Sequence, residues 1–260
     1  EGSEEEALRH LYHVGYDGLN VTMPLKERCR PYLCGESGAA AAVGAVNTLG
    51  RRRQGWWGTN TDVEGVVAAF GPRVRWHSGR VVVLGAGGAA RAAVAAALSQ
   101  GAPVVTVVNR HRERAARLAE DLGGQGPGRV EALAAQDRPW LALWQGTTCL
   151  IQATSAAADL PLGLTRADMV ALAQRRPEVV VLDMVYSPLR TALADVAAEV
   201  GLEFIPGTEM LLAQGAASFA VWTGTVPPLE AMRAALQAVV REGGATCSAF
   251  SPRESRTDRD

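Results

Sequence analysis

The sequence lacks the features that mark membrane, secreted and nucleic-acid-binding proteins. No run of about eighteen uninterrupted apolar residues occurs, and the N-terminus has none of the basic, apolar and small-residue succession of a secretory signal. The 26 basic and 27 acidic residues nearly cancel, so no global field would recruit nucleic acid or an anionic membrane. We therefore expect a small-molecule partner, no nucleic acid and no membrane.

Closely spaced cysteine pairs are also lacking. The four cysteines (Cys29, Cys34, Cys149 and Cys247) include no Cys-x-x-Cys pair, which argues against a zinc site and a disulfide framework. His10 and His13 could share a helix face, but no third ligand lies nearby in the sequence. We predict no metal site and a cytoplasmic location.

The second part of the chain alternates apolar strands with amphipathic helices. The predicted elements are Val81–Leu84, Ala89–Ser99, Val104–Val108, Arg112–Leu122, Leu150–Ala153 and Val179–Met184. Such alternation requires parallel strands joined by helical crossovers. The sequence thus predicts a doubly wound, Rossmann-type sheet.

A smaller α/β unit precedes this region. Gly18–Met23 reads as a strand stopped by Pro24, and Ala45–Leu49 with Trp56–Gly58 reads as a hairpin. Two further helices are predicted at Glu209–Trp222 and Pro228–Arg241. We expect an α/β fold with a discontinuous substrate domain (1–76 plus 208–240), a Rossmann domain (77–207) and a disordered tail (241–260).

The first strand of the predicted Rossmann domain runs into a glycine-rich turn. Residues 81–91 read VVVLGAGGAAR, which places Gly85, Gly87 and Ala90 at the spacing of the dinucleotide fingerprint. Glycines there let the backbone approach a pyrophosphate, whose charge is stabilised by free amides at the helix N-terminus. The alternative is a glycine-rich turn of some other α/β protein.

The second strand ends in Asn109 and Arg110, where an enzyme specific for NAD would carry Asp or Glu. Arg110 and Arg114 stand four residues apart, so both guanidinium groups can face a 2'-phosphate. This pattern favours NADP. The alternative is a solvated basic surface shared with Arg112 and Arg117.

Polar residues gather in the motifs of the smaller unit. GLNVTMPLKE (18–27), GAVNTL (44–49) and GTNTDVEG (58–65) place Lys26, Asn47 and Asp62 near strand ends, where open α/β sheets carry their chemistry. Hydride delivery to a ketone needs a proton donor beside the carbonyl oxygen, and Lys26 can serve. On spacing alone, Lys26 could equally be a surface residue and Asp62 a helix cap.

These motifs, in this order and ahead of the glycine-rich turn, resemble those of the shikimate dehydrogenase family. The resemblance continues through NRHRER (109–114), ATS (153–155), LDMVYSPLRT (182–191) and GTEMLLAQGAASFAVWTG (207–224). It covers the chain from about Gly15 to Gly224.

The resemblance implies NADP-dependent reduction of 3-dehydroshikimate to shikimate, a step of chorismate and aromatic amino-acid biosynthesis. It implies a catalytic pair, Lys26 and Asp62, and substrate contacts from Thr22, Asn47, Tyr186 and Gln214. The implied cofactor residues are Gly85, Ala86, Gly87, Gly88, Ala89, Asn109, Arg110, Arg114, Met184 and Gly207. Two alternatives remain, an NAD-using quinate/shikimate dehydrogenase and a truncated, catalytically impaired nucleotide-binding remnant. The oligomeric state stays open, with a homodimer as one option.

The sequence departs from the family pattern in several places. The family begins with a strand and a Ser-x-Ser-Pro loop that binds the substrate carboxylate, and neither Ser3 nor Ser37 matches that loop. If the chain truly begins at Glu1, the hydrogen bonds from the two serine hydroxyls of that loop to the substrate carboxylate are missing, and we expect a loss of roughly 3 to 6 kcal/mol in affinity, a hundredfold or more. Smaller departures are His111 and Gln152, and Ala156 with Ala157 in the loop on the nicotinamide side.

Overall fold

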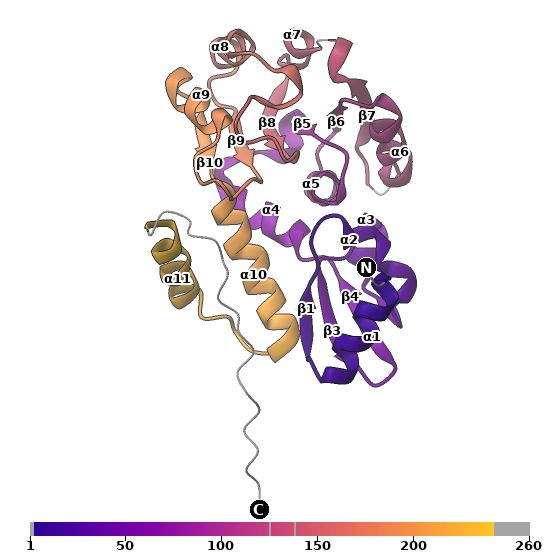
Figure 1. Cartoon of the computed structure of the whole chain (residues 1–260). Coiled ribbons are helices and arrows are strands. Elements are labelled where there is room, and N and C mark those ends of the chain that lie inside the picture. Colours follow the sequence, from indigo (N-terminus) through magenta and orange to yellow (C-terminus); the bar gives the residue numbers. More distant parts are fainter. Residues whose placement is uncertain (1–2, 125, 138, 242–260) are drawn as a thin grey trace, which may run out of the picture.

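The computed structural model describes residues 3–124, 126–137 and 139–241, which form two sheets of unequal size (Figure 1). The four-stranded sheet belongs to the smaller N-terminal unit and the six-stranded sheet to the larger one. Of the predicted disordered tail, only Arg241 is described, as the last residue of a helix, and the remainder lies outside the described residues. In the described part of the chain, no helix combines the length and hydropathy needed to span a membrane.

The smaller sheet contains the predicted hairpin. Its strands are β1 (Gly18–Asn20), β2 (Gly35–Glu36), β3 (Thr48–Arg52) and β4 (Gly55–Thr59), in the order β1-β3-β4-β2. Its helices are α1 (Glu4–Val14), α2 (Leu25–Arg28) and α3 (Gly38–Val43). The first hairpin strand begins at Thr48 rather than at Ala45, because the Val46 amide donates to the Lys26 carbonyl (2.8 Å) and leaves the ladder.

The larger sheet is parallel throughout. Its strands are β5 (Arg80–Leu84), β6 (Val104–Asn109), β7 (Arg129–Ala134), β8 (Thr147–Gln152), β9 (Val180–Asp183) and β10 (Glu203–Ile205). The order β7-β6-β5-β8-β9-β10 is that of the Rossmann fold, so the predicted fold class is confirmed. Helices α5 (Gly88–Ser99), α6 (Arg112–Leu122), α7 (Trp140–Leu143), α8 (Arg166–Arg175) and α9 (Ala192–Val200) alternate with these strands. Ligands of such sheets bind where the order reverses, here between β5 and β8.

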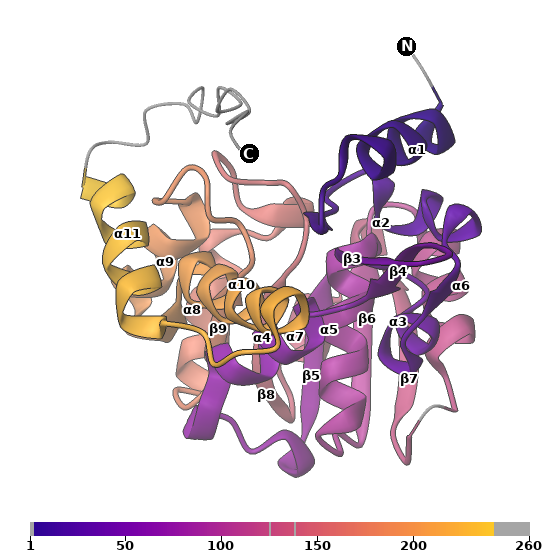
Figure 2. The same cartoon turned by 90° about the horizontal axis from the view of Figure 1, so that it is seen from below.

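Two helices connect the sheets. In Figures 1 and 2, α4 (Asp62–Phe70) and α10 (Gly207–Thr223) lie side by side, and α4 also packs on α5. Gly65 permits the close approach, since a Cβ there would lie 2.9 Å from Cβ of Gln214. The far end of α10 reaches the smaller sheet, where Trp222 Nε1 donates to the Leu49 carbonyl (2.9 Å). α11 (Leu229–Arg241) follows and packs on α10.

The connection from α4 to β5, residues 70–79, is anchored in the core. Phe70 and Trp76 are buried and meet edge to face, with 4.9 Å between ring centroids. The segment contains two of the short 3₁₀ helices, which span Arg30–Tyr32, Gly71–Arg73, Trp76–Ser78, Ala135–Asp137 and Pro161–Gly163.

A buried carboxyl group lies at the end of β9. Asp183 is fully buried and accepts hydrogen bonds from Thr191 Oγ1 (2.7 Å) and from the Val185 amide (3.0 Å). Burial raises the pKa of the Asp183 carboxyl, and these two bonds only partly oppose the shift. Thr191 Oγ1 also accepts from the Ala194 amide (3.2 Å) and so caps α9. One hydroxyl therefore stabilises both a helix start and a buried carboxylate.

We expect Thr191→Val to lower the free energy of unfolding by roughly 1–3 kcal/mol at neutral pH, because the cap and a hydrogen bond to a carboxylate are both lost. Losing the donor raises the folded-state pKa of Asp183 further. The deficit relative to the parent protein should therefore be largest above that pKa and shrink as the pH falls towards about 4. Denaturant unfolding at several pH values measures this. Thr191→Ser keeps the hydroxyl and should stay close to the parent, and equal deficits for both variants would contradict the assignment.

Candidate active site

A half-buried ion pair lies at the boundary between the two units. Lys26 Nζ, from α2, is 2.6 Å from Asp62 Oδ2, and the side chains are 18% and 4% exposed. Asp62 is the first residue of α4, where a negative charge is favoured by the helix dipole, yet it makes no capping bond. The alternatives of a free surface lysine and of a helix-capping aspartate are therefore excluded.

Lys26 is also the one lysine in the sequence, since the other basic residues are arginines. The two side chains differ chemically, because an ammonium can release a proton whereas a guanidinium stays protonated in proteins. A lysine in the ion pair can therefore take part in proton transfer, whereas an arginine would serve as well in a purely structural bridge.

Asn47 fixes the other oxygen of Asp62. Asn47 Oδ1 accepts from the Thr61 amide (2.7 Å), so Nδ2 must be the donor, and it lies 2.8 Å from Asp62 Oδ1. Gln214 Oε1, from α10, is 3.2 Å from the same Nδ2. The structure thus brings four of the predicted residues (Lys26, Asn47, Asp62 and Gln214) into one network.

A layer of buried hydroxyl groups underlies this network and was not predicted. Ser218 Oγ lies 2.7 Å from Thr48 Oγ1 and 3.1 Å from Thr61 Oγ1, and Asn20 Nδ2 lies 3.3 Å from it. Asn20, Thr48 and Thr61 stand in the quoted motifs beside the predicted residues, but only the approach of α10 assembles them with Ser218.

Two predicted substrate residues lie outside the network. The side chains of Thr22 and Tyr186 are exposed, Tyr186 by 47%, and neither makes a hydrogen bond within the described residues. Thr22 follows β1 and Tyr186 follows β9, so they extend from different sheets. Their predicted role is not tested by the contacts present.

The glycine-rich turn is shaped for a pyrophosphate. Gly85 has φ +114°, and a Cβ there would lie 2.9 Å from the Ala153 carbonyl oxygen. Gly87 faces open space and precedes α5, whose N-terminus has no side-chain cap. Free amides and an open approach fit the anion. The stem of Lys26 lies close by, because a Cβ at Gly88 would be 3.3 Å from both Cβ and Cδ of Lys26.

The remaining predicted cofactor residues surround the same ends of the parallel strands. Asn109 ends β6 and donates to the His111 carbonyl (3.0 Å), while Arg110 and Arg114 are exposed and have no ion-pair partner in the described chain. Met184 follows β9, and Gly207 opens α10, where a Cβ would lie 2.5 Å from the Val185 carbonyl oxygen. Ala86 lies in the turn itself, and Ala89 is the second residue of α5.

Gln152, a departure from the family pattern, holds the loop after β8. Its amide is buried, donates to Thr154 Oγ1 (2.9 Å) and to the Ala156 carbonyl (3.0 Å), and accepts from the Thr154 amide (2.9 Å). The loop is therefore fixed from beneath despite the altered residues at 156 and 157.

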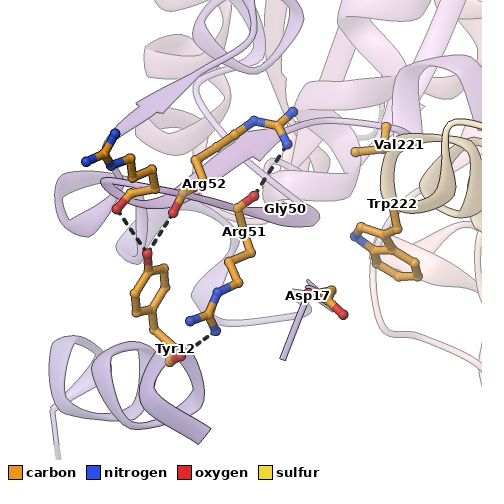
Figure 3. A pocket seen from close by; sticks show the side chains of 8 residues that line it. Tyr12, Asp17, Gly50, Arg51, Arg52, Val221 and Trp222 are labelled. Atoms are coloured by element: carbon orange, nitrogen blue, oxygen red, sulfur yellow. Dashed lines mark hydrogen bonds between the residues drawn. The ribbon is translucent and has the colours of Figure 1, made fainter. Parts of the chain in front are cut away.

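A hollow of about 410 Å³ lies at the opposite end of the smaller sheet from Lys26. Figure 3 shows the Tyr12, Arg51 and Arg52 side chains of its wall hydrogen-bonded to backbone carbonyls. Arg51 donates to the Tyr12 carbonyl and stacks on the Tyr12 ring, whose hydroxyl donates to the Arg52 carbonyl (2.7 Å). These contacts fasten α1 to the hairpin. Among the described residues, no cluster of His, Cys, Asp or Glu could hold a metal ion.

Comparison with known proteins agrees with this geometry. Three family models match: the shikimate dehydrogenase substrate-binding domain (residues 1–49), shikimate/quinate 5-dehydrogenase (69–185) and the shikimate 5'-dehydrogenase C-terminal domain (207–237). Shikimate dehydrogenase (NADP(+)) of Synechocystis is 38% identical over 237 residues, which cover 88% of this chain and 79% of that protein. Its counterpart in Halobacterium salinarum is 40% identical over 233 residues, which cover 89% and 82%.

Solved structures of similar proteins share the fold. Shikimate 5-dehydrogenase of Thermus thermophilus, in complex with NADP(H) and shikimate, has a TM-score of 0.74 at 30% identity and covers 90% of this chain and 83% of its own. Quinate dehydrogenase of Corynebacterium glutamicum, in complex with NAD, has a TM-score of 0.79 at 26% identity, with coverage of 91% and 83%. With its Rossmann sheet, its paired Lys26 and Asp62, and these relatives, the chain belongs to the shikimate dehydrogenase (NADP(+)) family.

Proposed function

We propose that this chain catalyses the reversible, NADP-dependent reduction of 3-dehydroshikimate to shikimate. The observation that carries the proposal is the Lys26–Asp62 pair, held beside the glycine-rich turn at the junction of the two units. NADPH, when bound, supplies the hydride. Lys26 donates a proton to the oxygen of the reduced carbonyl, and Asp62 holds the ammonium in place and accepts a hydrogen bond from a substrate hydroxyl.

The other predicted residues take supporting roles in this proposal. Gln214, Thr22, Tyr186 and Asn47 offer neutral groups that both donate and accept, which suits a ring bearing several hydroxyls. The uncapped α5 N-terminus receives the pyrophosphate, and Arg110 with Arg114 receives the 2'-phosphate. The division into a substrate domain (1–76 plus 208–240) and a cofactor domain (77–207), a homodimer and a cytoplasmic location also remain predictions.

The reaction is tested directly by following nicotinamide reduction with shikimate, using NADP and then NAD at rising substrate concentration. We expect turnover with a preference for NADP. Preference for NAD with quinate would support the quinate dehydrogenase alternative, whereas NADP binding without turnover would support the impaired remnant.

Lys26→Ala should lower kcat by roughly 10²- to 10⁴-fold, because the reaction loses its proton donor. Lys26→Arg is the matched variant, since it keeps the positive charge beside Asp62 but cannot release a proton. We expect both to lose turnover and both to bind NADPH normally in a fluorescence titration. Near-parental turnover in Lys26→Arg would show that only charge is required.

Arg110→Ala should weaken NADP binding by roughly 10- to 150-fold, the loss of a charge-assisted hydrogen bond of about 1.5–3 kcal/mol, and leave NAD binding nearly unchanged. Arg117→Ala is the control, because Arg117 is exposed on α6, the helix that follows Arg110, beyond its first turn. Equal weakening of the two cofactors would mean that Arg110 does not read the 2'-phosphate.

A further inference from the structure

Arg91 follows the dinucleotide fingerprint directly, yet its guanidinium is bonded to the smaller unit. Nε donates to the Val43 carbonyl (2.5 Å), and Nη1 lies 2.8 Å from Asp121 Oδ2 on α6. The side chain is only 12% exposed, whereas that of Asp121 is 42% exposed. The bond from Arg91 to the Val43 carbonyl is therefore better shielded from solvent than the ion pair with Asp121. It also crosses the boundary between the two units.

The segment that Arg91 holds leads directly to the active site. Val43 ends α3, where backbone carbonyls lack helical partners, and Gly44 then turns the chain with φ +71°. The backbone amide of Val46 donates to the Lys26 carbonyl (2.8 Å). The side-chain Nδ2 of Asn47 donates to Asp62 Oδ1 (2.8 Å). Segment 43–47 thus carries contacts to both members of the ion pair.

The same face of α5 also contacts the lysine stem. Gly88 precedes Arg91 by three residues, so the two project from one side of the helix. A Cβ at Gly88 would lie 3.3 Å from Lys26 Cβ and Cδ, tighter than ordinary van der Waals contact. This glycine occupies a variable position of the fingerprint, so the cofactor motif does not demand it. Because Gly88 has no side chain, the stem of Lys26 can pack closely against the start of α5.

We propose that Arg91 is a positioning residue, which sets the place of Lys26 and Asp62 relative to the helix that receives the cofactor. It acts through segment 43–47 and touches neither reactant. The inference rests on the proposed role of Lys26 in turnover. Its physical basis is that proton and hydride donors must converge on one carbonyl, and a displacement of about 1 Å can cost roughly a hundredfold in rate.

The experiment measures kcat and NADPH binding for Arg91→Ala. We expect kcat to fall roughly 10- to 100-fold while the Kd for NADPH stays within about twofold, and added guanidinium ion to restore part of kcat. Arg166→Ala is the matched control, because Arg166 makes an exposed ion pair with Glu199 (2.8 Å) on helices away from the site. It should leave both quantities unchanged.

A second readout uses the single lysine. Reductive methylation with ¹³C-formaldehyde labels Lys26 and the α-amino group of the chain, so one side-chain resonance reports on the environment of Lys26. That resonance should shift in Arg91→Ala and stay in place in Arg166→Ala. If Arg91 only stabilised the fold, Arg91→Ala would lower the unfolding midpoint and leave the Lys26 resonance in place.

Three results would overturn the proposal. They are parental kcat with an unmoved resonance, a weakening of NADPH binding that matches the loss of kcat, and lowered stability with parental kcat in the folded protein. If Arg91→Ala does not fold, Arg91→Lys is measured instead, because it retains one donor for the Val43 carbonyl, and it should give an intermediate kcat. Parental kcat in Arg91→Lys would count against the proposal. Substantial turnover in Lys26→Ala would instead refute the proposed role of Lys26, which separates the two failures.

Discussion

The ion pair between Lys26 and Asp62 is the constraint on which the arrangement of the active-site segments depends. A carboxylate that is only 4% exposed is costly unless each oxygen has a partner, and Asp62 obtains one from Lys26 and the other from Asn47. These partners come from α2 and from the approach to β3, while Asp62 itself starts α4. Satisfying one buried charge therefore fixes three segments of the chain relative to one another.

Close backbone packing makes this convergence feasible. Gly65 lets α10 lie against α4, which brings Gln214 to Asn47, the partner of Asp62, and Ser218 to the hydroxyl layer beneath. Gly88 does the same for α5 and the stem of Lys26. In both places a missing side chain allows a functional side chain from another element to approach. Glycines that the fingerprint does not require are consequently as informative about the site as those it requires.

The cofactor half is built mainly from backbone. The uncapped start of α5, the open space at Gly87 and the strand order around β5 and β8 create an anion site with few side chains. The exposed arginines after β6, Arg110 and Arg114, are proposed to select NADP, and buried Gln152 supports the neighbouring loop. The loop that contains positions 156 and 157 is held by Gln152, which precedes it, through bonds to Thr154 and to the Ala156 carbonyl. The two halves meet at α5, where cofactor binding and the positioning of Lys26 share one helix.

The sequence by itself determined the fold class and the position of the glycine-rich turn and singled out Lys26, Asn47 and Asp62, because hydrophobic periodicity and short motifs are local. Gln214 was added only by the resemblance. The resemblance then assigned their roles. Only the tertiary structure decided that Asn47 donates to Asp62, that Ser218 and Thr48 share a buried hydroxyl layer, and that Arg91 bonds across the unit boundary. Those contacts join residues far apart in the chain. These contacts depend on how closely the helices approach one another. The side-chain pattern along a single segment does not encode that distance.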